Sequence, residues 1–266
     1  MRNLNGLSKW VELECGFEPH LSASKIALFA NDLPSFICKY GLGIKTIDSP
    51  AMVRGRVIER FVVEALIGDA TIDKSIHNAI AYYNDCDRSY YKPAQWQRQV
   101  DAIPSIMTNA YEALVDYGPP SFPNGIDNQE RIEFEITGDR NEWAAPIVGY
   151  LDLVYPELGL IVDLKTTLRL PGDHMSWGHK LQSAFYKQAK SNFGVKFLYV
   201  STRGVKLFEQ DNMVNIRMMV EAKSLIERMN KFCHLLTPSQ ARGCIPTGDN
   251  IYWNDNPLWS MYNEKN

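Results

Sequence analysis

The sequence predicts an α/β protein of the α+β type, in which helices flank a mixed, mostly antiparallel central sheet and form a helical N-terminal lobe. Helical periodicity dominates before residue 118, whereas alternating β-type runs bounded by turn residues dominate after residue 130. Of the 266 residues, 45% are hydrophobic and 22% charged, as in ordinary globular proteins. We expect one domain, 1–266, with a helical lobe at about 20–117, a mixed core at about 126–236 and an irregular tail, 237–266.

In the N-terminal half, Ser22 or Ser24 can cap a short helix that runs through about Ala30. Residues 51–67 place their apolar side chains on one broad helical side, and Gly68 is a typical C-terminal stop. Residues 71–117 look helical with a break near 90–93, and the Pro- and Gly-rich residues 118–125 form a loop.

The second half alternates strands and helices. We expect a strand at 131–137, a hairpin within 147–167, a helix at 180–193 that ends at Gly194, strands at 195–201 and 205–210, and a long helix at 214–236. The hairpin turn is expected at Pro156–Gly159, because Pro and Gly there are turn signals.

The predicted hairpin gathers three charged side chains. Asp152 and Asp163 are each separated from the turn by three residues, so the two carboxylates would face each other across the ladder, and Lys165 would point to the same face as Asp163. Like charges opposed in a sheet are destabilising, and buried carboxylates need compensation. A hard divalent cation, which prefers oxygen ligands, would supply it.

Further motifs accompany this constellation. Gly55 and Glu59 form GxxxE in the predicted 51–67 helix, Gly149 precedes Asp152 as GxxD, Asp163 opens DxKT, and Gln182 and Tyr186 form QxxxY on one helical face. In this order the motifs resemble the PD-(D/E)XK nucleases, specifically the RecB-like and Cas4-like exonuclease branch that includes phage-type exonucleases. The resemblance implies a restriction-endonuclease-like core.

The resemblance also implies roles for individual residues. Asp152 and Asp163 match metal-binding carboxylates, the Leu164 carbonyl is a candidate further ligand, and Lys165 matches the lysine that orients or activates the attacking water. Glu59 falls where many relatives have a histidine ligand, so this ligand set would be all-carboxylate and would favour one or two Mg²⁺ or Mn²⁺ ions.

Five residues are candidates for contact with DNA. Gln182 and Tyr186 match the motif that lies against the DNA backbone, Arg54 and Arg56 neighbour the proposed metal site, and Ser24 lies in an N-terminal pattern typical of the branch. Alternatives stay open. The two aspartates could be solvated carboxylates, Lys165 an ion-pair partner, and Glu59 the partner of an arginine. Gln182 and Tyr186 could only cap the edge of the core, and the arginines could form a solvated helix face.

The expected function is metal-dependent hydrolysis of phosphodiester bonds from single-stranded or duplex DNA ends, in viral recombination, repair or replication. A non-catalytic DNA-binding or assembly module and a structure-specific endonuclease are the alternatives. A homo-oligomer or a recombination partner protein is compatible with this expectation. The five cysteines lack the grouping of an iron–sulfur site, so no such cluster is expected. No apolar run reaches the roughly 18 residues of a membrane span, and a cytoplasmic location (the host cytoplasm for a viral protein) is expected.

Overall fold

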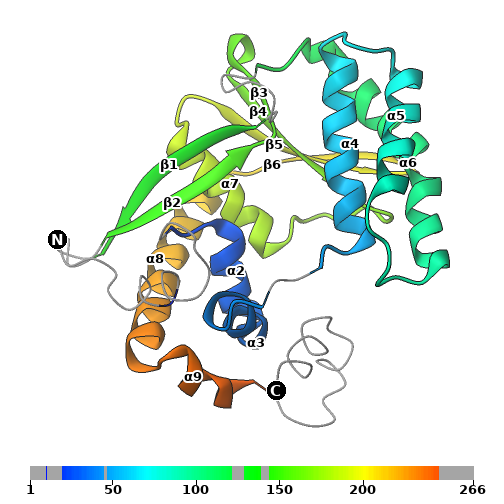
Figure 1. The fold of residues 1–266 in the computed structure, drawn as a ribbon. Helices are drawn as coiled ribbons and strands as arrows, with labels where there is room; N and C mark the ends of the chain where they lie inside the picture. The colour runs from blue at the N-terminus through cyan, green and yellow to red at the C-terminus, as the bar shows by residue number, and fades with distance from the viewer. Residues whose placement is uncertain (1–9, 11–19, 45–46, 122–128, 139–143, 246–266) are drawn as a thin grey trace.

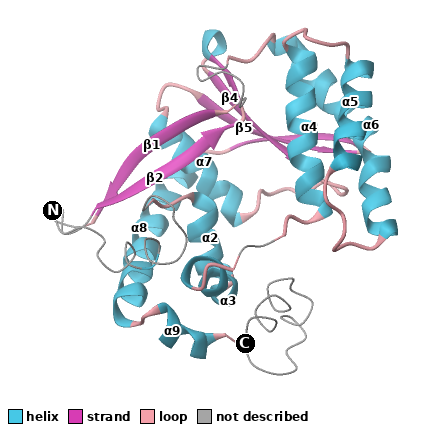
Figure 2. Ribbon diagram, viewed as in Figure 1, coloured by secondary structure: helices cyan, strands magenta, loops and turns pink. Residues whose placement is uncertain are grey.

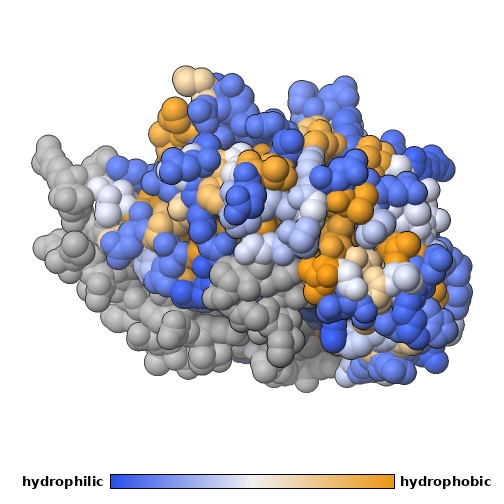
Figure 3. Space-filling model, turned by 90° about the horizontal axis from the view of Figure 1, so that it is seen from above, coloured by the Kyte–Doolittle hydropathy of each residue, from blue (hydrophilic) through white to orange (hydrophobic). Residues whose placement is uncertain are grey.

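The computed structural model describes residues 10, 20–44, 47–121, 129–138 and 144–245. Within them the predicted fold class is confirmed, because helices flank two β-sheets (Figures 1 and 2). No helix in these ranges is long and apolar enough to cross a membrane. Figure 3 shows one face of the molecule, on which hydrophilic residues separate small hydrophobic groups.

The strands are divided between two sheets. β1 (Glu130–Thr137) pairs antiparallel with β2 (Ala144–Leu151). The second sheet has the order β3 (Leu153–Tyr155), β4 (Leu160–Thr166), β5 (Gly194–Ser201) and β6 (Gly204–Glu209). Only β4 and β5 are parallel among the described pairs, so the expectation of a mostly antiparallel arrangement is correct. The division itself was not expected, and it falls at Asp152, between β2 and β3.

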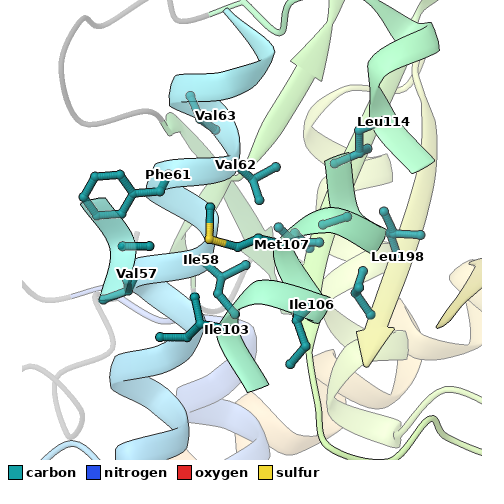
Figure 4. Packing of buried hydrophobic residues seen from close by; sticks show 14 of the residues in the cluster. Val57, Ile58, Phe61, Val62, Val63, Ile103, Ile106, Met107, Leu114 and Leu198 are labelled. Atoms are coloured by element: carbon teal, nitrogen blue, oxygen red, sulfur yellow. The ribbon is translucent and has the colours of Figure 1, made fainter. Parts of the chain in front are cut away.

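Helices cover both faces of the four-stranded sheet. Alternate sheet residues such as Val162, Leu164 and Leu198 pack with α4 (Pro50–Leu66), α5 (Ile72–Asp85) and α6 (Pro93–Leu114), as Figure 4 shows for part of this cluster. The intervening residues, such as Ile161 and Phe197, pack with Tyr186 of α7 (Trp177–Ala189). The period of two along β4 and β5 therefore places alternate residues in one or the other of two helical layers.

A third cluster joins α7 to α2 (Ala23–Asn31) and α8 (Asn212–Leu235). The remaining short elements are α3 (Leu33–Phe36), η1 (Ile37–Gly41), η2 (Val115–Tyr117), η4 (Pro156–Leu158), α9 (Pro238–Ala241) and η5 (Arg242–Cys244).

Local signals explain most helix ends. Ser22 caps α2 by accepting the Lys25 N–H, Ser49 caps α4 ahead of Pro50, and Gly68 follows α4 with a φ of 82°. The expected end of the helix at Gly194 is wrong. α7 ends at Ala189, and Gly194 begins β5, where its N–H donates to the Gly159 carbonyl. This backbone hydrogen bond joins the start of β5 to the turn that precedes β4.

Candidate active site

Asp152 lies at the bend where the chain passes from one sheet to the other. The predicted register is confirmed over three pairs, Leu153 with Val162, Val154 with Ile161 and Tyr155 with Leu160. Asp152 stands one residue beyond this ladder, opposite Asp163, and its Oδ2 accepts the Leu164 N–H at 3.0 Å. The side chain is therefore held in place by backbone of β4, although Asp152 itself belongs to no strand.

Asp163 and Lys165 project from β4 toward α7. Asp163 is fully buried, at 0% exposure, and its Oδ1 lies 2.6 Å from Lys165 Nζ. This oxygen forms an ion pair but lacks a hydrogen bond of good geometry. The expectation that Lys165 shares a face with Asp163 is correct, because the two are neighbours on one side of the strand.

Glu59 reaches the same place from α4. Gly55, one turn before Glu59, lies beside the end of β4, because a Cβ there would lie 3.4 Å from Thr166 Oγ1. Glu59 Oε1 accepts a hydrogen bond from Gln129 Nε2 at 2.8 Å, and the same nitrogen donates to Asp152 Oδ1 at 3.0 Å. The structure therefore links Glu59 to Asp152 through Gln129.

The QxxxY pair supports the site from α7. Tyr186 is buried, and its hydroxyl contacts the Tyr150 carbonyl at 2.5 Å, Asp163 Oδ2 at 3.2 Å and Gln182 Nε2 at 2.5 Å. A Cβ at Gly149 would lie 3.2 Å from the Ile132 side chain, so glycine there makes room for Ile132, and the Tyr186 ring lies beside the same position at 3.5 Å. Tyr186 thus orients Asp163 from within the protein.

The carboxylates share a strongly perturbed electrostatic environment. Burial, followed by the charges of Asp163 and Glu59, raises the pKa of Asp152 well above its usual range. Burial also raises the pKa of Glu59, against the lowering effect of its bond from Gln129. Burial alone would lower the pKa of Lys165, but Asp163 and Asp152 outweigh it and the net shift is upward. Lys165 is therefore held as a cation among excess negative charge.

A cleft of about 750 Å³ opens beside this cluster, although neither Asp163 nor Glu59 is among its lining residues. Asp152, Lys165, Gln129 and Gln182 contribute to its lining, and Ser24 of α2 lies on the lining as well. The rest of the lining includes His20, Ser22, Gly149, Tyr150, His179 and Phe185. The volume lies within the range of ordinary ligand pockets.

The donor set suits a hard divalent cation, although the described residues contain no preformed group of three His, Cys, Asp or Glu side chains in metal-binding geometry. Gln129 instead donates to Glu59 and Asp152, and Lys165 neutralises Asp163. Burial is the largest cause of the raised pKa values of Asp152 and Glu59, and the negative charge of Asp163 adds to both. The Leu164 N–H donates to Asp152, and the role of the Leu164 carbonyl as a metal ligand stays a prediction.

Two expectations about the arginines need revision. Arg54 does not lie on a solvated helix face: it is 2% exposed, and its guanidinium contacts Gln99 and, at 3.5 Å, Thr166 Oγ1. A buried side chain bonded across to α6 is not available to a DNA backbone. Arg56 is exposed but pairs with Asp48 at 2.7 Å and lies outside the lining of the cleft.

The structure adds residues that sequence motifs did not single out. Gln129 precedes β1 and matches no motif, so only its contacts reveal it. His179 lines the cleft, and its Nδ1 contacts the Tyr199 hydroxyl. Burial and then the charge of Lys165 lower the pKa of His179, so its imidazole is neutral at about pH 7.

We compared the chain with protein-family models, curated proteins and solved structures. No protein-family model and no curated protein matches the chain. Among solved structures, one described as "Crystal structure of SSO0001" aligns over 74% of this chain and 88% of that chain, with 14% identity and a TM-score of 0.33. At this level of similarity, any functional argument depends on the residues and their geometry.

Proposed function

We propose that this chain is a metal-dependent deoxyribonuclease of the PD-(D/E)XK type that hydrolyses phosphodiester bonds from DNA ends. The convergence of Asp152, Asp163 and Lys165 beside an open cleft carries the proposal. Buried carboxylates that repel one another destabilise a protein, so their grouping around one lysine favours a functional site over a structural one. Glu59 supports it by adding a third carboxylate from a separate element.

The positions of the site residues suggest a role for each of them in hydrolysis. Asp152, Asp163 and Glu59 would hold a divalent cation, which when bound would lower the pKa of a water molecule and offset charge on the phosphate. Lys165, kept protonated by its neighbours, would place a positive charge beside a phosphate in the cleft. Tyr186 and Gln182 would keep Asp163 oriented through the tyrosine hydroxyl.

The preference for DNA ends follows the motif resemblance, and two alternatives use the same site differently. An endonuclease would keep the chemistry and cut within a strand. A non-catalytic binding module would have no need for the charged cluster, and the retention of both aspartates with Lys165 argues against it.

The test is a substrate panel. Purified protein with Mg²⁺ or Mn²⁺ is given end-labelled linear single-stranded DNA, linear duplex and circular DNA. Exonuclease activity predicts mononucleotides or short oligomers from linear DNA and intact circles. Nicked circles would indicate an endonuclease, and intact DNA throughout would reject the proposal.

A further inference from the structure

Gln129 occupies the point where two carboxylates of the cluster meet. Its single side-chain nitrogen lies 2.8 Å from Glu59 Oε1 and 3.0 Å from Asp152 Oδ1. Both distances are those of N–H···O hydrogen bonds, and an ionised carboxylate acceptor strengthens such a bond. Because a primary amide nitrogen carries two hydrogens, it can donate one to each carboxylate at the same time.

The orientation of the amide follows from its neighbours. Both partners are carboxylates, which are acceptors when ionised, so the nitrogen end of the amide and not the oxygen end faces them. A small group with partial positive charge thus bridges Glu59 and Asp152. Because Asp152 Oδ2 already accepts the Leu164 N–H, a divalent cation bound between these two residues would compete with Gln129 for Asp152 Oδ1.

We propose that Gln129 is a placeholder for the cation: its amide satisfies Glu59 and Asp152 in the metal-free protein and is displaced when a divalent ion binds. This inference rests on the metal-dependent function proposed above. Displacement breaks two charge-assisted hydrogen bonds, so Gln129 weakens cation binding relative to the same three carboxylates without it. In return it holds the two carboxylates together while the cation is absent.

The opposite possibility makes a different prediction. If the amide turned on metal binding and offered Oε1 as a ligand, Gln129 would strengthen binding. The two possibilities can be distinguished by replacing Gln129 with a side chain of similar length that neither donates a hydrogen bond nor binds a hard cation. Methionine is such a side chain, because its thioether is a soft ligand.

The experiment is a Mn²⁺ titration of the full-length protein by calorimetry at about pH 8, where protons compete least with Mn²⁺ for the carboxylates. Gln129→Met is compared with the wild type and with Gln97→Met. Gln97 is the matched control, because on the surface of α6 its Nε2 donates to Asp101 Oδ1 at 2.8 Å. Should Gln129→Met fail to fold, Gln129→Asn serves, since it is one methylene too short to reach both carboxylates.

We expect Gln129→Met to bind Mn²⁺ at least about tenfold more tightly than the wild type, because the two hydrogen bonds from Gln129 no longer have to be broken. Gln97→Met should match the wild type. Binding by Gln129→Met that is unchanged or weaker would overturn the placeholder role alone and leave the nuclease proposal standing. Absence of Mn²⁺ binding by the wild-type protein would overturn both, and the DNA panel reports independently on the nuclease activity.

Discussion

Replacing Asp152 with asparagine should stabilise the metal-free protein above neutral pH. Burial and the charges of Asp163 and Glu59 raise the pKa of Asp152 well above its usual range. The folded wild type therefore holds a proton that the unfolded chain releases, and its free energy of unfolding falls as the pH rises from the usual aspartate range through the raised pKa. Asparagine does not titrate, so Asp152→Asn avoids this loss.

The size of the effect follows from two opposing contributions. Each unit by which the pKa is raised costs the ionised wild type about 1.4 kcal/mol of unfolding free energy. The asparagine oxygen can still accept the Leu164 N–H, but the second bond, from Gln129, is lost at a cost of about 1 kcal/mol. We expect the electrostatic gain to exceed the loss of this one hydrogen bond. About 1 kcal/mol corresponds to roughly 2–4 °C in Tm for a chain of this size, so we expect a rise of a few degrees.

The assay is thermal denaturation in the presence of a chelator across a pH series from about 5 to about 8. Asp173→Asn is the control, because the Asp173 side chain is 94% exposed and forms a surface ion pair with Lys206. Asp152→Asn should lie above the wild type at the alkaline end, with a smaller slope against pH. A Tm below that of the wild type at the alkaline end, or the same slope, would refute the repulsive environment assigned to Asp152.

Three other predictions follow from the site. Lys165→Met should lose roughly 10²-fold or more in cleavage rate while still binding Mn²⁺. The surface variant Lys231→Met should cleave at the wild-type rate. Near wild-type cleavage by Lys165→Met would show that Lys165 takes no part in the reaction. Glu59→Gln should weaken activation by Mg²⁺ with partial rescue by Mn²⁺, and an unaltered metal titration would exclude Glu59 as a ligand. Iron and acid-labile sulfide analysis of purified protein should find neither, since the five cysteines lack cluster spacing.

The hairpin register was predictable because it depends on a short local turn. Pro156 and Gly159 bound that turn, and the pairs that follow from it, such as Leu153 with Val162, occur in the structure. The break at Asp152 was not predictable, since an uninterrupted β-type run gives no sign that its two parts join different sheets. The site depends on that break, because Asp152 leaves the ladder and turns to the Leu164 N–H.

Other features of the site depend on long-range contacts. The pattern of α4 identifies its apolar side but does not show that Arg54 is buried against Gln99 of α6. Gln129 belongs to no motif, and only the meeting of α4 with the bend at Asp152 gives it two partners. In contrast, the side shared by Asp163 and Lys165 follows from strand periodicity alone.

The most direct test of the central claim compares the wild type with Asp163→Asn on end-labelled linear DNA in the presence of Mn²⁺. Asparagine keeps the shape of the buried side chain and can still accept a hydrogen bond from the Tyr186 hydroxyl, but it removes the negative charge that pairs with Lys165. We predict release of short products by the wild type, loss of that release on chelation, and no detectable release by a folded Asp163→Asn. Cleavage by Asp163→Asn at the wild-type rate, or wild-type cleavage that persists in chelator, would contradict a metal-dependent site built on Asp152, Asp163 and Lys165.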